Sequence, residues 1–163
     1  MKRISFVAAL CTLILICGLQ AAAQNHVIIN ATGFSYIAGM PDYTQGKGLV
    51  AGGSATPVDG FANLAVPQGA VITGFRMCAR DFASDQNVSA DLWRKTVNPI
   101  NSAFTAPQRM AHVQTSVAGA QDAMQCLKTN IITGPTVDDT QWTYFVEVHI
   151  GFTTELISVN VNY

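Results

Sequence analysis

Apolar and polar residues alternate along Gln141–Ile150, and this period of two constrains the fold more than any other feature of the chain. One parity of the run consists of Trp142, Tyr144, Val146, Val148 and Ile150. The other consists of Thr143, Phe145, Glu147 and His149. Successive side chains of a strand point to opposite faces of a sheet, so the run predicts a strand with one face on a core.

Similar short runs recur along the chain, separated by clusters of turn residues. The strands that we expect are His26–Asn30, Gly33–Ala38, Lys47–Gly52, Ala62–Val66, Ala70–Ala79, Asn87–Lys95, Met110–Val117, Gln141–Ile150 and Thr154–Tyr163. The segment Gln121–Thr129, which carries Cys126, is left unassigned. The polar turn Asp81–Gln86 predicts a hairpin between Ala70–Ala79 and Asn87–Lys95. In the last strand we expect Ile157, Val159, Val161 and Tyr163 to face the core. Many short strands with no sustained helical period indicate an all-β fold, an antiparallel β-sandwich or a barrel.

Residues 1–23 are predicted to be a cleavable signal peptide. Met1–Arg3 is positively charged, Ile4–Leu19 is almost wholly apolar, and small residues precede a cut after Ala23. The alternative is an uncleaved membrane anchor, because the apolar stretch approaches the roughly 20 residues that span a bilayer. Polar interruptions and the terminal alanines favour cleavage. We therefore expect a single exported domain, residues 24–163, that is secreted or periplasmic and does not contact the membrane after cleavage.

Loss of the leader leaves an acidic chain with few charges. Removing Lys2 and Arg3 reduces the nine Lys and Arg residues to seven, against ten Asp and Glu, for a formal charge of −3. The chain has no basic run, so the sequence gives no support for nucleic-acid binding through phosphate neutralisation.

Two of the four cysteines, Cys78 and Cys126, lie outside the leader. In an oxidising compartment an isolated pair predicts one disulfide, whose loop of roughly 50 residues contributes about 4 kcal/mol on the chain-entropy model. Two buried free thiols, or a redox pair, are the alternatives. A redox pair normally has C-x-x-C spacing, which is absent here.

Trp93 is the principal candidate for ligand binding. On the expected strand it shares a face with Asn87, Ser89 and Asp91. An exposed aromatic ring beside amide and carboxylate groups can stack on a sugar ring and orient its hydroxyls. Tyr36, Tyr43 and Trp142 could extend such a platform. The alternative is a buried Trp93, covered by a loop such as Pro99–Pro107.

Other polar groups are weaker candidates for chemistry. Glu147 and His149 share a strand face and could bind zinc or act as a base with its orienting group. The chain has no H-x-H or H-E-x-x-H motif and no cysteine ligand set, so the polar, solvent-facing side of a strand is the favoured interpretation. Two pairs of carboxylates, Asp81 with Asp85 and Asp138 with Asp139, could contribute to a calcium site. They lack the density of a dedicated calcium loop, and Asp is a common turn residue. We expect no catalytic residue, no metal site and no cofactor.

Several segments resemble a recurrent pattern of exported bacterial proteins. They are Val66–Phe75, Asp81, Asn87–Arg94, Thr136–Asp139, Trp142-x-Tyr144 and Ser158–Tyr163. The pattern reads L-P-x-G-A-x-I-T-x-[VF], an Asp-containing turn, and then L-x-V-x-L-[YW]-R. The resemblance implies a single jelly-roll-like β-sandwich without an assigned activity. Cys78 departs from it, since an aromatic residue is more usual at that position.

Three functions follow from these observations. The leading one is an exported, non-enzymatic β-sandwich that binds an unidentified partner, a glycan or another cell-surface component, or has a structural role at the surface. The second is a carbohydrate-binding module, which depends on an accessible Trp93. The third is a small secreted hydrolase or metal enzyme, which needs Glu147 and His149 to meet a third ligand or a nucleophile.

Overall fold

The computed structural model describes residues 25–38, 42–44, 49–51, 57–82, 86–97, 106–115 and 121–163. The predicted signal peptide, residues 1–23, lies outside this part of the chain. Among the described residues, no helix has the length and apolar character needed to cross a bilayer.

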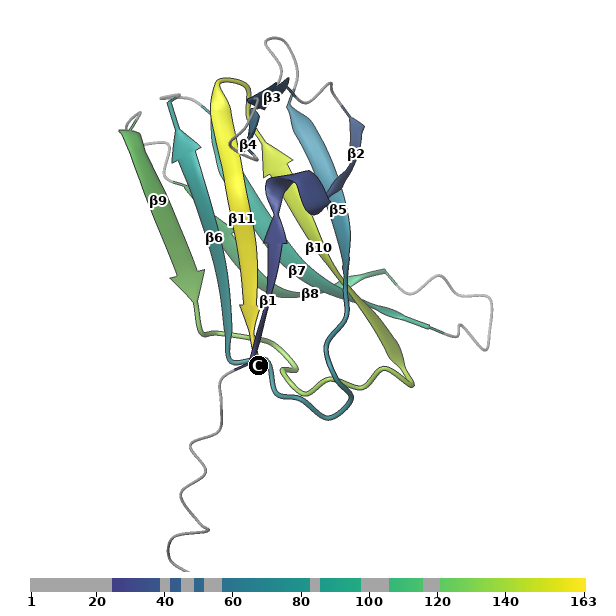
Figure 1. Ribbon diagram of the computed structural model, residues 1–163. Coiled ribbons are helices and arrows are strands. Elements are labelled where there is room, and N and C mark those ends of the chain that lie inside the picture. The colour runs from purple at the N-terminus through teal and green to yellow at the C-terminus, as the bar shows by residue number, and fades with distance from the viewer. Residues whose placement is uncertain are drawn as a thin grey trace, which may run out of the picture.

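Two antiparallel sheets form the fold (Figure 1). The six-stranded sheet has the order β3 (Asp42–Thr44), β4 (Leu49–Ala51), β11 (Thr154–Asn162), β6 (Gly74–Asp81) and β9 (Gln121–Thr129), and β1 (His26–Asn30) pairs with the later part of β11. The five-stranded sheet has the order β2 (Ser35–Ala38), β5 (Val58–Leu64), β10 (Trp142–Ile150), β7 (Val88–Thr96) and β8 (Gln108–Gln114). A short 3-10 turn, η1 (Ala31–Gly33), connects the sheets between β1 and β2. Most connections after β4 cross from one sheet to the other. The predicted jelly-roll-like β-sandwich is therefore confirmed.

The two sheets enclose one core, which the inward parity of each strand supplies. In β10 the residues Tyr144, Val146, Val148 and Ile150 are at most 5% exposed, as the alternation predicts. Opposite them, the six-stranded sheet contributes the buried residues Phe75, Met77, Ala79, Leu156, Val159 and Val161. The side chains of the opposite parity point away from this core, toward the outer faces of the sandwich.

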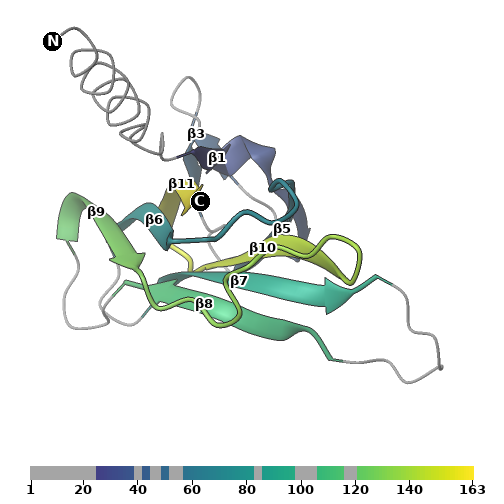
Figure 2. The same ribbon diagram turned by 90° about the horizontal axis from the view of Figure 1, so that it is seen from below.

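The predicted hairpin between Ala70–Ala79 and Asn87–Lys95 is wrong. β6 pairs with β11 and β9, whereas β7 pairs with β10 and β8 in the other sheet. Figure 2 shows the two strands in separate layers. Alternation assigns the faces of each strand, but it carries no information about which strand is the hydrogen-bonded neighbour. The polar turn was consistent with either arrangement.

A β-bulge in β11 changes which of its residues face the core. Leu156 pairs with Ala79 and Ser158 pairs with Cys78, so Ile157 is the extra residue. Leu156 is fully buried, and Ile157 is only partly so. Leu156 thus takes the core position expected for Ile157. The short strand β3 lies in a segment that the sequence pattern left as a loop.

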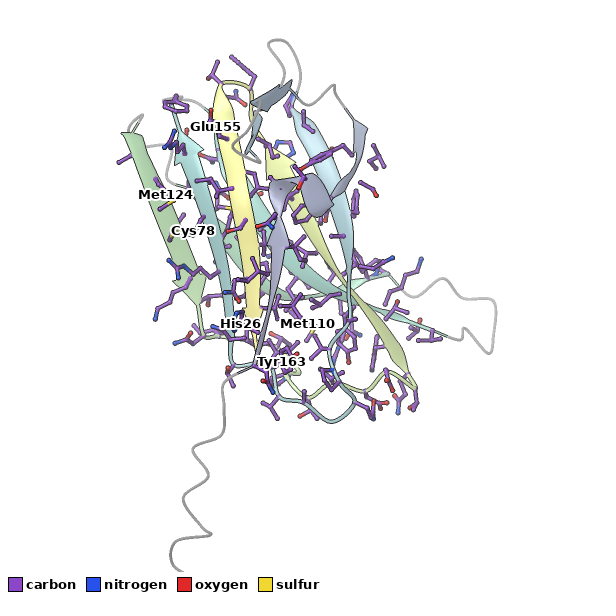
Figure 3. All side chains as sticks on the ribbon, in the orientation of Figure 1. His26, Cys78, Met110, Met124, Glu155 and Tyr163 are labelled. Atoms are coloured by element: carbon purple, nitrogen blue, oxygen red, sulfur yellow. A yellow bond between two sulfur atoms is a disulfide. The ribbon has the colours of Figure 1, made fainter. Side chains whose placement is uncertain are left out.

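The predicted disulfide between Cys78 and Cys126 is present. The two residues are register partners in β6 and β9, with their Cα atoms 4.1 Å apart, and they face outward (Figure 3). β9 is an edge strand of the six-stranded sheet, and edge strands have pairing on one side only. The disulfide therefore fixes both the attachment and the register of this edge.

A buried polar connection links the sheets at one end of the sandwich. The hydroxyl of Thr115, just after β8, donates to Asp81 Oδ2 at 2.5 Å and accepts from the Val88 backbone N–H at 3.0 Å. Asp81 lies in β6 and Val88 in β7, so one hydroxyl bridges strands of different sheets. Thr115 and Asp81 are 2% and 0% exposed, so their polar atoms depend on partners within the protein.

We expect the double variant Cys78→Ser/Cys126→Ser to unfold at a lower temperature than the wild type. Loss of a loop closed over 48 positions costs about 4 kcal/mol on the chain-entropy model. Thermal unfolding with and without reductant measures the effect. Reductant should lower the midpoint of the wild type and leave that of the variant unchanged. Equal midpoints for the two proteins without reductant would contradict the expectation.

We expect Thr115→Val to destabilise the fold by about 1–3 kcal/mol, because it removes one partner from each of two buried polar groups. Chemical denaturation monitored by circular dichroism measures this loss. Thr143→Val is the matched control, since its hydroxyl is exposed and bonds only the Lys95 carbonyl oxygen among the contacts observed. A control that loses as much stability as Thr115→Val would show that the buried bridge has no special role.

Candidate functional site

Three aromatic side chains lie side by side on the outer face of the five-stranded sheet. They are Phe61 from β5, Phe145 from β10 and Trp93 from β7, which are neighbouring strands. The ring centroids of Phe61 and Phe145 are 6.3 Å apart with the planes tilted by 42°. Those of Phe145 and Trp93 are 6.5 Å apart with the planes nearly parallel, at 13°. We call these three residues the aromatic row.

The aromatic row occupies the outward parity of its strands, so it takes no part in the core between the sheets. All three side chains are partly exposed. The Trp93 Nε1 atom is buried and has no hydrogen-bond partner among the described residues. Because Nε1 is the only polar atom of the indole, the exposed surface of the Trp93 side chain is carbon. The row therefore presents apolar ring surface on the outside of a sheet.

Carboxylates lie beside the aromatic row. In the register, Glu147 of β10 is opposite Phe61 on one side and opposite Asp91 on the other. Asp91 accepts from His112 Nδ1 at 2.8 Å and forms an ion pair with Arg109 at 3.4 Å. Glu147 makes no hydrogen bond or ion pair with any described residue. Its carboxylate is a partly exposed acceptor next to apolar rings.

Glu147 and His149 share a strand face as predicted, but they do not bond each other. Both lie on the outer face, where His149 Nδ1 bonds Asp59 Oδ1 at 2.6 Å. Both members of the His149–Asp59 pair are well exposed, with 49% and 39% of their side-chain surface accessible. Within the described residues, no group of three His, Cys, Asp or Glu side chains is placed to hold a metal ion.

Trp93 and Asp91 lie in this site, two residues apart on β7, whereas Asn87 lies apart from it. Asn87 precedes β7, and its backbone oxygen accepts from the Gly151 N–H at 3.0 Å. Six residues of extended chain separate it from Trp93, about 20 Å along the sheet. The structure does not bring its side chain to the aromatic row, so a binding role for Asn87 stays a prediction.

Tyr36 and Trp142 do not extend the aromatic row. The Tyr36 ring packs over Gly60, and its hydroxyl donates to the Ala31 carbonyl oxygen at 2.5 Å. Trp142 belongs to the inward parity of β10, and the Arg94 guanidinium lies 4.4 Å from its ring centroid. The side chain of Tyr43 and residues 99–105 of the Pro99–Pro107 loop lie outside the part that the structure describes.

A shallow hollow of about 440 Å³ lies beside the middle of the row, next to Phe145. Its lining includes Trp142, Asp139, Asn63 and Thr143. Asn63 is the register partner of Phe145, so the hollow continues from the aromatic row toward the end of the sandwich. Trp142 therefore lines the hollow beside the row, although its position in β10 has the inward parity.

One member of each carboxylate pair considered for calcium, Asp138 and Asp81, has a structural partner. Asp138 Oδ1 accepts from the Thr140 hydroxyl at 2.6 Å and from the Thr140 N–H at 3.2 Å. The hydroxyl bond is the main cause that lowers the pKa of Asp138. Asp81 bonds Thr115 in the interior, and Asp85 lies outside the described residues. The observed bonds of Asp138 are those of a turn residue.

Sequence reasoning did not identify Phe61 and Phe145 as site residues. Phe145 carried a local signal, because it is a large aromatic in the otherwise polar parity of the strongest strand. Phe61 carried none, since it joins the row only through the pairing of β5 with β10.

Comparison with known proteins identifies similar folds among solved structures. The chain matches no protein-family model and no curated protein sequence. Among solved structures, it is similar to the C-terminal CBM6 of LamC, a marine laminarinase from Zobellia galactanivorans. That match has a TM-score of 0.55 and 8% identity, and it covers 85% of this chain and all of that one.

Two further structures are similar at the level of the fold. The xylan-binding module CBM15 gives a TM-score of 0.51 at 12% identity, over 86% of this chain and 97% of that one. The isomalto-dextranase of Arthrobacter globiformis T6 gives 0.50 at 15% identity, over 83% of this chain and 23% of the enzyme. At these identities the likenesses show that this chain shares the β-sandwich fold of these modules.

Proposed function

We propose that the chain is an exported carbohydrate-binding module whose aromatic row holds a glycan. The observation that carries the proposal is the alignment of Phe61, Phe145 and Trp93 across three adjacent strands on an outer face. Aromatic residues contribute large apolar contact areas, and burying them in a core is the usual arrangement. Three of them in partial contact with water, on a face that no other strand of the described residues covers, favour a binding role.

The chemistry of the face suits a sugar. Pyranose rings present C–H groups on their faces, which pack on aromatic carbon, and hydroxyl groups at their edges, which need hydrogen-bond partners. Glu147 offers an unpaired carboxylate between the row and Asp91, and a carboxylate accepts short, strong hydrogen bonds from hydroxyls. Asn63 adds an amide next to Phe145. Rings spaced by 6.3–6.5 Å give successive stacking positions along the row.

The fold comparisons support this proposal over the more general interpretation of an unspecified binding or structural module. CBM6 of LamC and the xylan-binding module CBM15 are carbohydrate-binding by name, and this chain covers all or nearly all of each. We further propose that residues 1–23 direct export, that residues 24–163 act as one domain, and that the domain binds without catalysing a reaction. We expect a neutral glycan on this face, because Asp91 is paired with Arg109 and Glu147 remains as a carboxylate without a cation beside it among the described residues.

We expect Trp93→Ala and Phe145→Ala each to weaken glycan binding about tenfold, because each removes a ring from the stacking surface. Affinity electrophoresis of residues 24–163 in gels containing soluble xylan or neutral β-glucan measures the effect. Phe82→Ala is the matched control, since Phe82 is 37% exposed and lies directly after β6, outside the row. If the wild type binds one of these polymers and both row variants bind it equally well, the row is not the site. A wild type that binds none of a broad neutral panel would overturn the proposal.

We expect Glu147→Ala to weaken binding of the same polymer by about tenfold, through loss of hydrogen bonds to a charged acceptor. Glu147→Gln should retain part of the affinity, because its amide oxygen still accepts. Titration calorimetry with oligosaccharides of that polymer measures the affinities of the Glu147→Ala and Glu147→Gln variants. Glu155→Gln, on the six-stranded sheet, is the control for the change in net charge. An unchanged affinity in Glu147→Ala would show that the carboxylate does not contact the sugar.

A further inference from the structure

A second hollow lies on the outer face of the six-stranded sheet, on the opposite side of the sandwich from the aromatic row. Its volume is about 310 Å³, and Gly74, Arg76, Lys128, Asn130 and Asn162 contribute to its lining. These residues come from β6, from β11 and from the end of β9 with the turn that follows it. The hollow therefore depends on the pairing of three strands.

Glycine at position 74 keeps the hollow open. A Cβ atom built on Gly74 would lie 3.2 Å from Asn162 Nδ2 and 3.4 Å from Asn130 Oδ1. The two side-chain amides thus approach each other over the backbone of Gly74. Rotation of either amide group presents an N–H or a carbonyl oxygen to the hollow, so both can donate to a ligand.

Two positive charges lie beside these amides without an ion-pair partner among the described residues. Arg76 and Lys128 are direct register partners of β6 and β9, and both side chains are exposed. Like charges directly opposite each other on a sheet face are destabilising. Neither residue makes a hydrogen bond or an ion pair with any described group. The remaining described cations differ in this respect: Arg80, Arg94, Lys95 and Arg109 all have interactions within the protein.

The ion pair on the same face lies too far away to neutralise the two charges. Glu155 pairs with Arg80 at 3.8 Å, and Arg80 is four residues along β6 from Arg76, about 13 Å. Figure 3 shows Glu155 at one end of β11 and His26, the register partner of Asn162, at the other. The hollow is at the His26 end.

The disulfide holds the two cations together. Cys78 and Cys126 are register partners on the same face, and each lies two residues from Arg76 or Lys128 along its own strand. Without the covalent link, the edge strand β9 could relieve the repulsion by separating or by shifting register. The bond therefore keeps Arg76 and Lys128 side by side on the outer face of the sheet.

We propose that this hollow binds an oxoanion, a sulfate ester or a carboxylate carried by an acidic polysaccharide. The Arg76 guanidinium can bind such a group through two N–H donors, and the Lys128 ammonium adds a second charge. The side-chain amides of Asn130 and Asn162 bond neighbouring hydroxyls of the polysaccharide. With a sulfate ester, they can also bond its third terminal oxygen. The site is separate from the aromatic row and does not depend on the function proposed for it.

The proposal is tested by measuring binding to dextran sulfate, polygalacturonate and unmodified dextran. Inorganic sulfate is added in a separate competition experiment to test binding of the free ion. We expect the wild type, as residues 24–163, to bind dextran sulfate or polygalacturonate and not to bind dextran. Its affinity for the charged polymers should fall as the salt concentration increases. Arg76→Gln and Lys128→Gln should each weaken binding about three- to tenfold. Comparison of the affinities for dextran sulfate and polygalacturonate shows whether the hollow prefers a sulfate ester or a carboxylate. Competition by inorganic sulfate at low concentration would assign the site to the free ion.

Two variants distinguish a built site from general attraction to a polyanion. Arg80→Gln removes one positive charge from the same face but outside the hollow, and it should leave binding unchanged. Gly74→Ala keeps every charge and should weaken binding, because its Cβ fills the space below the amides. Equal losses in Arg80→Gln and Arg76→Gln, or no polyanion binding by the wild type, would overturn the proposal. Trp93→Ala should not alter polyanion binding, so this result is independent of the aromatic row.

Discussion

The alternation of side chains along β10 is the constraint on which the rest of the structure depends. This strand is at the centre of the five-stranded sheet, with β5 on one side and β7 on the other. Its inward parity supplies Val146, Val148 and Ile150 to the core, each fully buried. Its outward parity places Phe145 and Glu147 in the candidate site. A one-residue shift in register would exchange the two sets, so the core energetics that fix the register also fix the site.

Patterns within one strand were readable from the sequence, and relations between strands were not. The period of two located nearly all the strands and their buried faces, because it reflects a local steric property of the backbone. The partner of each strand is decided by contacts distant in sequence, which is why the β6–β7 hairpin was wrong. Ile157 was misassigned for a related reason, since a bulge becomes visible only against the neighbouring strand.

The same limit applies to both candidate sites. Trp93 and Asp91 were identified because they share a face of one strand, but Phe61 joins them through the pairing of β5 with β10. Arg76 and Lys128 are far apart in a sequence that has no basic run, and β-pairing makes them neighbours. A sheet assembles binding surfaces across its strands, so the residues of one surface come from several segments of the chain. Local motifs can identify only the members that share a strand.

The two outer faces of the sandwich have opposite chemical character, and the core keeps them apart. One presents apolar rings with carboxylates, and the other presents Arg76 and Lys128 with side-chain amides. The first face rests on β10, whose two neighbours hold its register through main-chain pairing along its length. The second rests on β9, an edge strand with one neighbour, where two like charges oppose the pairing. The Cys78–Cys126 disulfide joins the two strands where main-chain pairing is one-sided and the neighbouring side chains carry like charges.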